Sequence, residues 1–264
     1  MMGDVGLPTA TLSEVDRPGA QPSWRPAAVF FDFFGTLISD RSLRANHLRQ
    51  LRFVADSIAA DATDQELRAA YRRGMAESYG VVSVLPAYQH RTLFAGAFTA
   101  MAGALGGHID ESVAQEAVDR QYRATIEHAT ARPGAIGTLG ALRQASVHVQ
   151  IVSNIDDEQL HPLIDRLGLD DVIDAATSSE EARSCKPDPG IYRVALAKVG
   201  CRPADALFVG DSLHHDVEGP SAVGMRTAWL AQDGAHPSPG EARPDFIVHQ
   251  LAEVTGLVDV VAGR

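Results

Sequence analysis

The pattern of apolar residues changes character along the chain. Residues 27–32, AAVFFD, are a continuous apolar run that ends in an acid, which predicts a strand buried on both faces of a sheet. From about 40 to 130 the apolar residues recur at helical spacing instead, which predicts a series of amphipathic helices. Pro133 and Gly134 mark the end of that stretch.

After this stretch, apolar runs alternate with helical patterns. We predict strands at 147–154, 172–176, 206–211, 226–230 and 245–248. We predict helices at 136–145, 157–167, 186–200, 214–223 and 249–258. The third of these helices has Asp188 as a candidate N-cap and Pro189 in its first turn. Strands that alternate with helices predict an α/β fold with a doubly wound, Rossmann-like parallel sheet.

The helical stretch interrupts this alternation just after the first strand, so it reads as an insertion. We therefore predict a core domain made of residues 26–39 and 131–264, with an α-helical cap domain of residues 40–130 inserted into it. Residues 1–25 are rich in Pro, Gly, Ser and Thr and are expected to form a flexible N-terminal leader.

Composition narrows the class of protein. The 264 residues are 45% hydrophobic and 22% charged, as in ordinary globular domains. A net charge of -11 argues against broad binding to a nucleic-acid backbone. Two cysteines are too few for a disulfide framework, so we expect a cytoplasmic protein. No run of about 18 apolar residues and no signal peptide are seen, so no membrane association is expected.

Polar residues follow several of the predicted strands. Asp32 ends the first, Ser153 and Asn154 end the second, and Asp211 ends another, with Lys186 between them in the chain. Open parallel sheets bind ligands at the carboxyl ends of their strands, so these side chains are expected to converge. Oxygen ligands without His or Cys suit Mg²⁺. Alone, each residue could be an N-cap, a turn residue or a solvated lysine, but the set favours a phosphate site.

Lysine usage supports this interpretation. Lys186 and Lys198 are the only lysines in the sequence. A lysine is a compact charge suited to a phosphoryl oxygen or a carboxylate, which fits Lys186. Lys198 lies late in a predicted helix, where a cation is favourable without any further role.

The same residues resemble four motifs of the haloacid dehalogenase superfamily. FFDFFGTL looks like its first motif, Asp-x-Asp-x-Thr, and IVSN looks like the second. The KPDP at 186–189 resembles the third, and VGDSLHHDVEGPSAVGM resembles the fourth. The resemblance covers roughly residues 27–258 and implies a magnesium-dependent hydrolase with a helical cap inserted after the first motif.

The resemblance implies roles for individual residues. Asp32 would attack phosphorus and form an aspartyl-phosphate. The expected Mg²⁺ ligands are the Asp32 carboxylate, the Phe34 backbone carbonyl and Asp211, with Asp216 supporting the site through a water or by pairing with the lysine. Thr36 would orient the first loop, and Lys186 would neutralise charge around the nucleophile. Substrate contacts are expected from Phe34, Gly35, Ser153, Asn154 and Lys186.

One position departs from the pattern of the family phosphatases. These enzymes carry a second Asp two residues after the nucleophile, which protonates the leaving oxygen, and here that residue is Phe34. General acid–base catalysis is worth about 10²–10⁴-fold. Either the leaving group needs little help, or another residue substitutes, or the reaction differs. The candidate substitutes are His47, His90, His214 and His215, although each can also be an ordinary surface or core histidine.

Anion recognition and the choice of reaction stay open. Candidate contacts to an anionic substrate are Arg41, Arg44, Arg49 and Arg91.

Phosphonoacetaldehyde hydrolases also lack the second Asp, but they need a cap lysine, and residues 40–130 contain none. 2-Haloacid dehalogenases need no metal, which would leave Asp211 unexplained. The preferred reading is a phosphatase of a small phosphorylated metabolite, as a monomer or homodimer. The alternatives are a dehalogenase and a non-catalytic member that binds a ligand or partner.

Overall fold

Six parallel strands form the central sheet. The computed structural model describes residues 24–232 and 234–259, without the side chains of residues 40–45 and 259. The strand order is β3-β2-β1-β4-β5-β6, and every neighbouring pair is parallel. The strands are β1 (Ala28–Phe31), β2 (His148–Ser153), β3 (Ala175–Ser178), β4 (Ala206–Gly210), β5 (Arg226–Leu230) and β6 (Phe246–Val248). The predicted α/β fold with a parallel sheet is confirmed.

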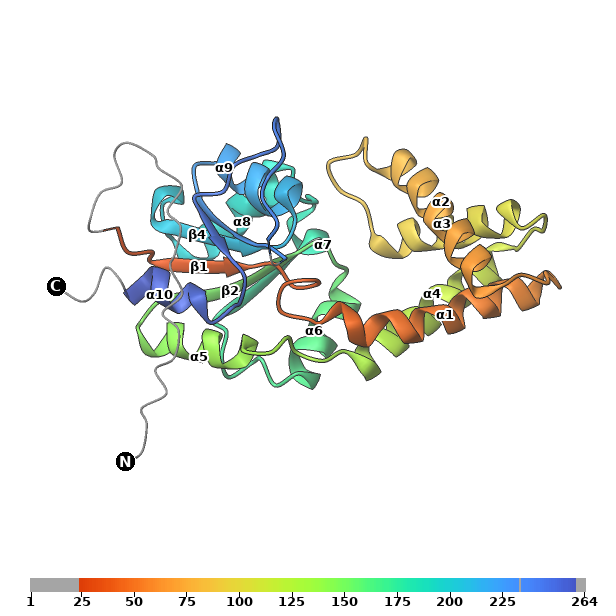
Figure 1. The fold of residues 1–264 in the computed structure, drawn as a ribbon, viewed down its shortest axis with the longest axis horizontal. Helices are drawn as coiled ribbons and strands as arrows, with labels where there is room; N and C mark the ends of the chain where they lie inside the picture. The colour runs from red at the N-terminus through yellow and green to blue at the C-terminus, as the bar shows by residue number, and fades with distance from the viewer. Residues whose placement is uncertain (1–23, 233, 260–264) are drawn as a thin grey trace, which may run out of the picture.

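Helices cover both faces of this sheet, as a doubly wound fold requires. Figure 1 shows α5 (Ala135–Gln144) and α10 (Glu253–Asp259) below the sheet, and α8 (Pro189–Val199) and α9 (Gly219–Ala222) above it. The remaining helices beside the sheet are α6 (Asp157–Arg166), α7 (Ser179–Ala182), the 3₁₀ turn η1 (Pro203–Asp205) and the π-helical turn η2 (Leu213–Glu218). None of the helices in the described residues has the length and apolar character needed to cross a bilayer.

The apolar run at residues 28–31 follows from the position of β1 in the middle of the sheet. Val29 and Phe31 pack into the cluster that α5, α6 and α10 cover. Ala28 and Phe30 pack into the opposite cluster, under α8. A strand buried on both faces needs apolar residues at every position, so the alternation typical of a half-exposed strand is lost.

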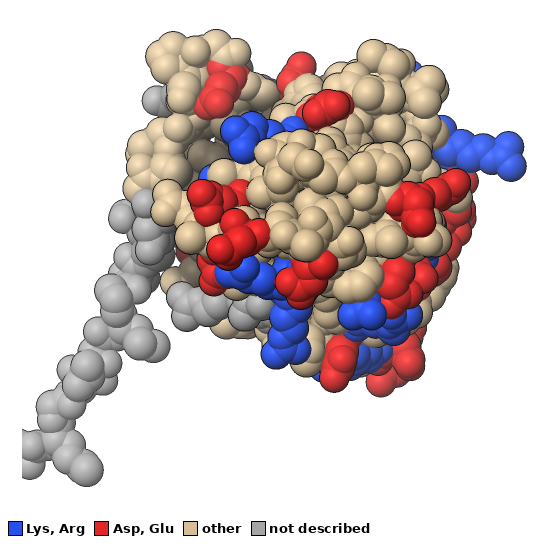
Figure 2. All heavy atoms as spheres, turned by 90° about the vertical axis from the view of Figure 1, so that its right-hand side faces the viewer, with Lys and Arg blue, Asp and Glu red and all other residues tan. Residues whose placement is uncertain are grey.

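Four helices form a separate layer with its own apolar cluster, at the right of Figure 1. They are α1 (Asp40–Ser57), α2 (Asp64–Val82), α3 (His90–Ala104) and α4 (Glu111–His128). Helix α2 begins with a capping box between Thr63 and Glu66. A Cβ on Gly74 would come within 2.4 Å of the Ala97 carbonyl oxygen, so this glycine permits close packing of α2 on α3. On this end of the molecule, acidic and basic side chains are interspersed (Figure 2).

The structure corrects three predicted boundaries. Strand β3 spans Ala175–Ser178 rather than 172–176, because the Val172 N–H bonds to the Leu169 carbonyl and closes a turn. The predicted helix 214–223 is divided between η2 and α9. The predicted helix 249–258 begins only at Glu253, whose carboxylate accepts a hydrogen bond from the His249 N–H.

The predicted leader, residues 1–25, lies outside the described residues except for its last two. Trp24 Nε1 donates a hydrogen bond of 2.7 Å to the Ala204 carbonyl, and its ring stacks on Phe246. The Arg25 guanidinium donates to the Ala145 carbonyl. These two residues are therefore tied to the core.

Candidate active site

The carboxyl ends of three adjacent strands bring the predicted site residues together. Asp32 follows β1, Ser153 ends β2 and Asp211 follows β4, and these strands are neighbours in the order β2-β1-β4. Asp32 and Ser153 are buried, with 6% and 2% of their surfaces exposed. The Ser153 hydroxyl lies 3.5 Å from Asp32 Oδ1, at the limit of a hydrogen bond.

A buried lysine bridges two carboxylates at this edge. Lys186 Nζ donates to Asp32 Oδ1 at 2.6 Å and to Asp216 Oδ1 at 2.7 Å. Burial disfavours the charged ammonium, but the attraction of Asp216 and Asp32 outweighs it and holds the pKa of Lys186 above its usual range. Lys186 is therefore charged in the folded protein, and its ammonium contacts both carboxylates.

The backbone of Lys186 is fixed by the Asn154 side chain. Asn154 Nδ2 donates to the Lys186 carbonyl at 3.0 Å, and Asn154 Oδ1 accepts from the Lys186 N–H at 2.6 Å. Both ends of this side-chain amide are used, so any contact between Asn154 and a ligand falls to its backbone. The sequence places Asn154 at the site but contains no signal for this second role.

Two glycines allow the carboxylates to approach the strand ends. Gly35 has a φ of +83°, and a Cβ there would lie 2.5 Å from Asp211 Oδ2. A Cβ on Gly210 would lie 2.3 Å from the Asp216 carboxyl carbon. Thr36 Oγ1 donates to Asp211 Oδ1 at 3.3 Å, which ties the loop after β1 to the loop after β4. Within its own loop, the Gly35 N–H donates to the Ile38 carbonyl at 3.2 Å.

Three carboxylates at this edge could hold a cation. Asp32, Asp211 and Asp216 each offer an oxygen, and these oxygens all lie within 4.8 Å of one another. Burial, together with the Asp32 charge, raises the pKa of Asp216 against the opposing pull of Lys186. One ammonium against three carboxylates leaves negative charge in excess, which a divalent cation would balance. An all-oxygen donor set of this kind fits Mg²⁺. We call Asp32, Lys186, Asp211 and Asp216 the acid–lysine cluster.

Phe34 separates this cluster from a cavity beneath the helical layer. The cavity has a volume of about 420 Å³ and opens at Phe34. Its other polar lining comes mainly from α1, α2 and α4, namely Asn46, His47, Gln50, Arg68 and Gln121. We call it the cap cavity.

The four candidate histidines have different environments. His47 lines the cap cavity, where burial and then the Arg68 charge lower its pKa to about 4. Burial, followed by the Lys186 charge, lowers the pKa of His215 to about 4 as well. Both are therefore neutral at pH 7, which suits proton acceptors better than donors. His214 is exposed, and its Nδ1 lies 2.8 Å from Glu218 Oε2. His90 is buried, and its Nδ1 lies 3.7 Å from Asp156 Oδ1.

The four candidate arginines differ in what the structure shows of them. Arg91 forms ion pairs with Asp119 and Glu158, at 2.6 and 2.7 Å. Arg49 is exposed. The side chains of Arg41 and Arg44 lie outside the described residues. Arg68, which the sequence did not single out, is the arginine that lines the cap cavity.

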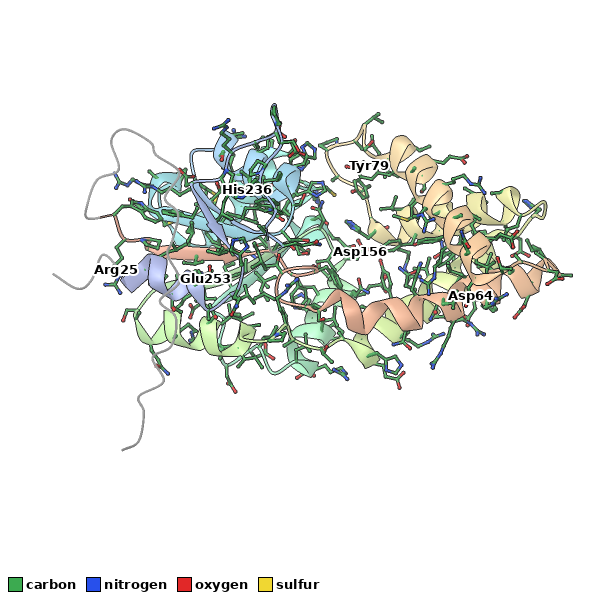
Figure 3. The ribbon with its side chains drawn as sticks, in the orientation of Figure 1. Arg25, Asp64, Tyr79, Asp156, His236 and Glu253 are labelled. Carbon is green, nitrogen blue, oxygen red and sulfur yellow. The ribbon has the colours of Figure 1, made fainter. Side chains whose placement is uncertain are left out.

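Asp156 is a second residue that sequence reasoning missed. It precedes α6 and reads as its N-cap, yet its side chain makes no capping bond there. Its carboxylate instead accepts 2.8 Å hydrogen bonds from the His90 and Arg91 N–H groups, which begin α3, and one of 2.9 Å from the Tyr122 hydroxyl. Burial alone would raise the pKa of Asp156, but these interactions lower it. Asp156 thus joins the sheet to the helical layer (Figure 3).

Arg132 holds the loop that follows Asp32. Its guanidinium donates to the Gly35 carbonyl, and its backbone N–H donates to the Leu37 carbonyl at 2.7 Å. The chain enters the helical layer after residue 39 and leaves it shortly before Arg132. The hydrogen bonds of Arg132 to Gly35 and Leu37 therefore join the two segments that connect this layer to the sheet. Its role could not be found from the sequence, because an arginine at a domain crossing is usually solvated.

The chain resembles known hydrolases of two activities. A family model for haloacid dehalogenase-like hydrolases matches residues 26–224. Ribulose-1,5-bisphosphate 5-phosphatase of Halopiger xanaduensis is 31% identical over 147 residues, which cover 53% of this chain and 62% of that protein. (S)-2-Haloacid dehalogenase 1 of Pseudomonas sp. is 35% identical over 98 residues, which cover 37% of this chain and 43% of that protein.

Solved structures show the same fold. The magnesium-bound HAD-hydrolase YfnB from Bacillus subtilis superposes with a TM-score of 0.73 at 19% sequence identity, over 89% of this chain and 99% of that chain. The sequence matches to the two curated relatives span only 62% and 43% of those proteins, so they do not carry over an activity. The family model, in contrast, covers well over half of the chain. The chain belongs to the haloacid dehalogenase-like hydrolase family.

Proposed function

We propose that this hydrolase is a magnesium-dependent phosphatase of a small phosphorylated metabolite, with Asp32 as the covalent nucleophile. The observation that carries the proposal is the acid–lysine cluster, in which Lys186 bridges Asp32 and Asp216 while Asp211 completes an all-oxygen cation site. A dehalogenase has no use for the two additional carboxylates, and burying Asp216 without a function is costly. We also propose that residues 40–130 form a cap domain on a core of residues 26–39 and 131–264, in a cytoplasmic enzyme.

In the first step, an Asp32 carboxylate oxygen attacks phosphorus. A bond from this oxygen to phosphorus forms, the bond from phosphorus to the ester oxygen breaks, and the leaving oxygen takes a proton from water. The Lys186 ammonium pairs with the attacking carboxylate, and Ser153 and the Asn154 backbone bind phosphoryl oxygens. The loop of Phe34, Gly35 and Thr36 stays fixed against Asp211. Asp32, Asp211 and the Phe34 carbonyl, supported by Asp216, would hold Mg²⁺, which when bound would supply positive charge for the transferring phosphoryl group.

In the second step, water attacks phosphorus of the aspartyl-phosphate and the Asp32 oxygen leaves. Inorganic phosphate is released, and the Asp32 carboxylate is regenerated. Phe34 cannot give a proton to the leaving oxygen in the first step, so the enzyme is suited to leaving groups of low pKa, such as those of acyl phosphates and anomeric sugar phosphates.

A second candidate function rests on Phe34 itself. An aromatic residue in place of the second Asp suits displacement of halide from carbon, which needs no proton on the leaving group. In that reaction Asp32 would form an ester to carbon rather than to phosphorus. A third candidate, binding without turnover, would leave the buried Asp32–Lys186 pair without a chemical purpose.

The test is a paired screen of the purified protein. Phosphorylated metabolites and 2-haloacids are supplied with and without MgCl₂, and phosphate and halide are measured. Asp32→Asn is the catalytic variant. Asp165→Asn, at an exposed position of α6, is the matched control. Magnesium-dependent phosphate release that only Asp32→Asn abolishes supports the proposal. Halide release without magnesium contradicts it in favour of a dehalogenase, and no release of either product favours binding without turnover.

A further inference from the structure

The cap cavity contains a cation that other groups leave unpaired. Arg68, on α2, forms no ion pair with any described carboxylate. None of the described residues that line the cavity is an aspartate or a glutamate. The acids nearest to Arg68 on α2 have partners of their own, because Asp64 pairs with Arg52 and Glu66 bonds to Thr63. Arg68 is thus a partly buried cation without an ion-pair partner among the described carboxylates, in a chain with a net charge of -11.

The positive charge of Arg68 acts inside the cavity. After burial, it is the Arg68 charge that most strongly lowers the pKa of His47, on the neighbouring helix α1. His47 is accordingly uncharged at pH 7 and does not add a second cation. Among the described residues, an anion that entered the cavity would meet the positive charge of Arg68 and a set of neutral polar groups.

Gln50 provides a buried acceptor in the same cavity. Only 5% of its surface is exposed. Its Nε2 donates to the Arg120 carbonyl at 3.1 Å, which fixes the orientation of the amide. Its Oε1 has no hydrogen-bond partner among the described residues. A buried carbonyl oxygen without a donor is unfavourable, so a ligand with hydroxyl groups would satisfy it.

We infer that the cap cavity binds the end of the substrate that is not transferred, and that this end carries a second anionic group, a carboxylate or a second phosphate, which pairs with Arg68. A hydroxyl group of the same ligand donates to Gln50 Oε1. The inference rests on the proposed function, since the scissile phosphate lies at Asp32 on the other side of Phe34. A cavity of about 420 Å³ is large enough for a sugar or polyol of this kind.

The test compares three ligands that differ only at one position. Glucose 1-phosphate carries one anion, whereas glucose 1,6-bisphosphate and glucuronate 1-phosphate add a phosphate or a carboxylate at carbon 6. Loss of the anomeric phosphate is followed with the wild type, with Arg68→Gln, and with Arg73→Gln, an exposed arginine on the same helix. Binding of the same ligands is also measured by calorimetry in the Asp32→Asn background, which needs no turnover.

We expect the wild type and Arg73→Gln to prefer one or both two-anion ligands in KM and in binding. A charge-assisted pair is worth about 10- to 100-fold, and Arg68→Gln should reduce the preference by this factor. The two arms show whether the second anion is a phosphate or a carboxylate. Equal affinity for all three ligands, or a preference that survives in Arg68→Gln, overturns the inference. Phosphate release without such a preference leaves the proposed function standing, whereas a binding preference without phosphate release contradicts the proposed function alone.

Discussion

The acid–lysine cluster and the cap cavity face each other across Phe34 but are built in opposite ways. In the cluster, Lys186 contacts two carboxylates at 2.6 and 2.7 Å, and Asn154 clamps its backbone. In the cavity, the Gln50 carbonyl oxygen and the Arg68 guanidinium have no hydrogen-bond or ion-pair partner, respectively, among the described residues. In the cluster the charged groups contact one another, whereas in the cavity these two groups are available to a ligand.

This difference separates the groups proposed to carry out the reaction from the groups proposed to select the substrate. Groups that must hold a charge through a reaction are fixed in advance, because electrostatic stabilisation is strongest where nothing has to reorganise. Groups that recognise a substrate are left unpaired, because a hydrogen bond or ion pair to the ligand then adds to binding. Variants in the cluster should therefore affect turnover and folding, and variants in the cavity should affect mainly which substrate is used.

The largest effect is expected from removing the nucleophile. Asp32→Asn should lower magnesium-dependent phosphate release by about 10⁴-fold or more, since the covalent step cannot occur. Stopped-flow or endpoint phosphate assays measure it, with Asp165→Asn as the control. Residual activity within tenfold of the wild type would assign the nucleophile to another group.

The next effect is on stability, and the two lysines provide a matched pair. Lys186→Met leaves two buried carboxylates without their cation and should lower the free energy of unfolding of the metal-free protein by about 3–5 kcal/mol. Lys198, partly exposed and paired with Glu181, should cost only about 1 kcal/mol when changed to Met. Urea unfolding measures both, and equal losses would contradict the contrast. Added magnesium should worsen neither variant and should partly rescue Lys186→Met.

Phe34→Asp would place a proton donor at the boundary between the two regions. Alkyl phosphates, whose leaving oxygens need a proton, should then be hydrolysed about 10²-fold faster or more. Acyl phosphates should change little, because their leaving groups are already stable as anions. The ratio of kcat/KM for the two classes measures the effect. A ratio that stays constant would show that the missing Asp is replaced by another residue.

The smallest effect concerns the pH dependence of stability in the cavity. The pKa of His47 is about 4 in the folded protein against an ordinary value of 6.5, so the unfolded chain binds the proton more readily. Stability should therefore fall as the pH decreases from 7 to 5, with His47 responsible for about 2 kcal/mol. His47→Gln should flatten this part of the pH profile. His161→Gln, at an exposed position of α6, should leave it unchanged. An unchanged slope in His47→Gln would refute the prediction.

The sequence predicted the structure best at the ends of the buried strands, where a charged side chain has few alternative positions. An apolar run followed by an acid locates Asp32 and Asp211 at strand ends, because a buried parallel strand leaves few other positions for a carboxylate. The pairing of Lys186 with Asp216 was among the expected roles, and the structure shows it at 2.7 Å. The parallel sheet and the helical layer after β1 also followed from the spacing of apolar residues.

The parts that could not be predicted depend on contacts between distant segments. Asp156 reads as the cap of its own helix, yet it caps α3, which lies more than 50 residues away in the chain. Gln50 and Arg68 lie on amphipathic helices whose polar positions mostly face solvent, so nothing local marks the ones that face the cavity. Predicted helix ends were wrong at 214–223 because no periodic pattern distinguishes a π-helical turn from an α-helix.

The central claim is that Asp32 carries a phosphoryl group during turnover, and trapping this intermediate tests it most directly. The protein is mixed with an acyl phosphate and magnesium, quenched in acid within milliseconds, digested, and analysed by mass spectrometry. The account predicts that the peptide containing Asp32 gains the mass of one phosphoryl group, and that the gain disappears without magnesium. An unmodified Asp32 during rapid phosphate release would contradict the claim, as would an Asp32 ester to carbon formed from a 2-haloacid without magnesium.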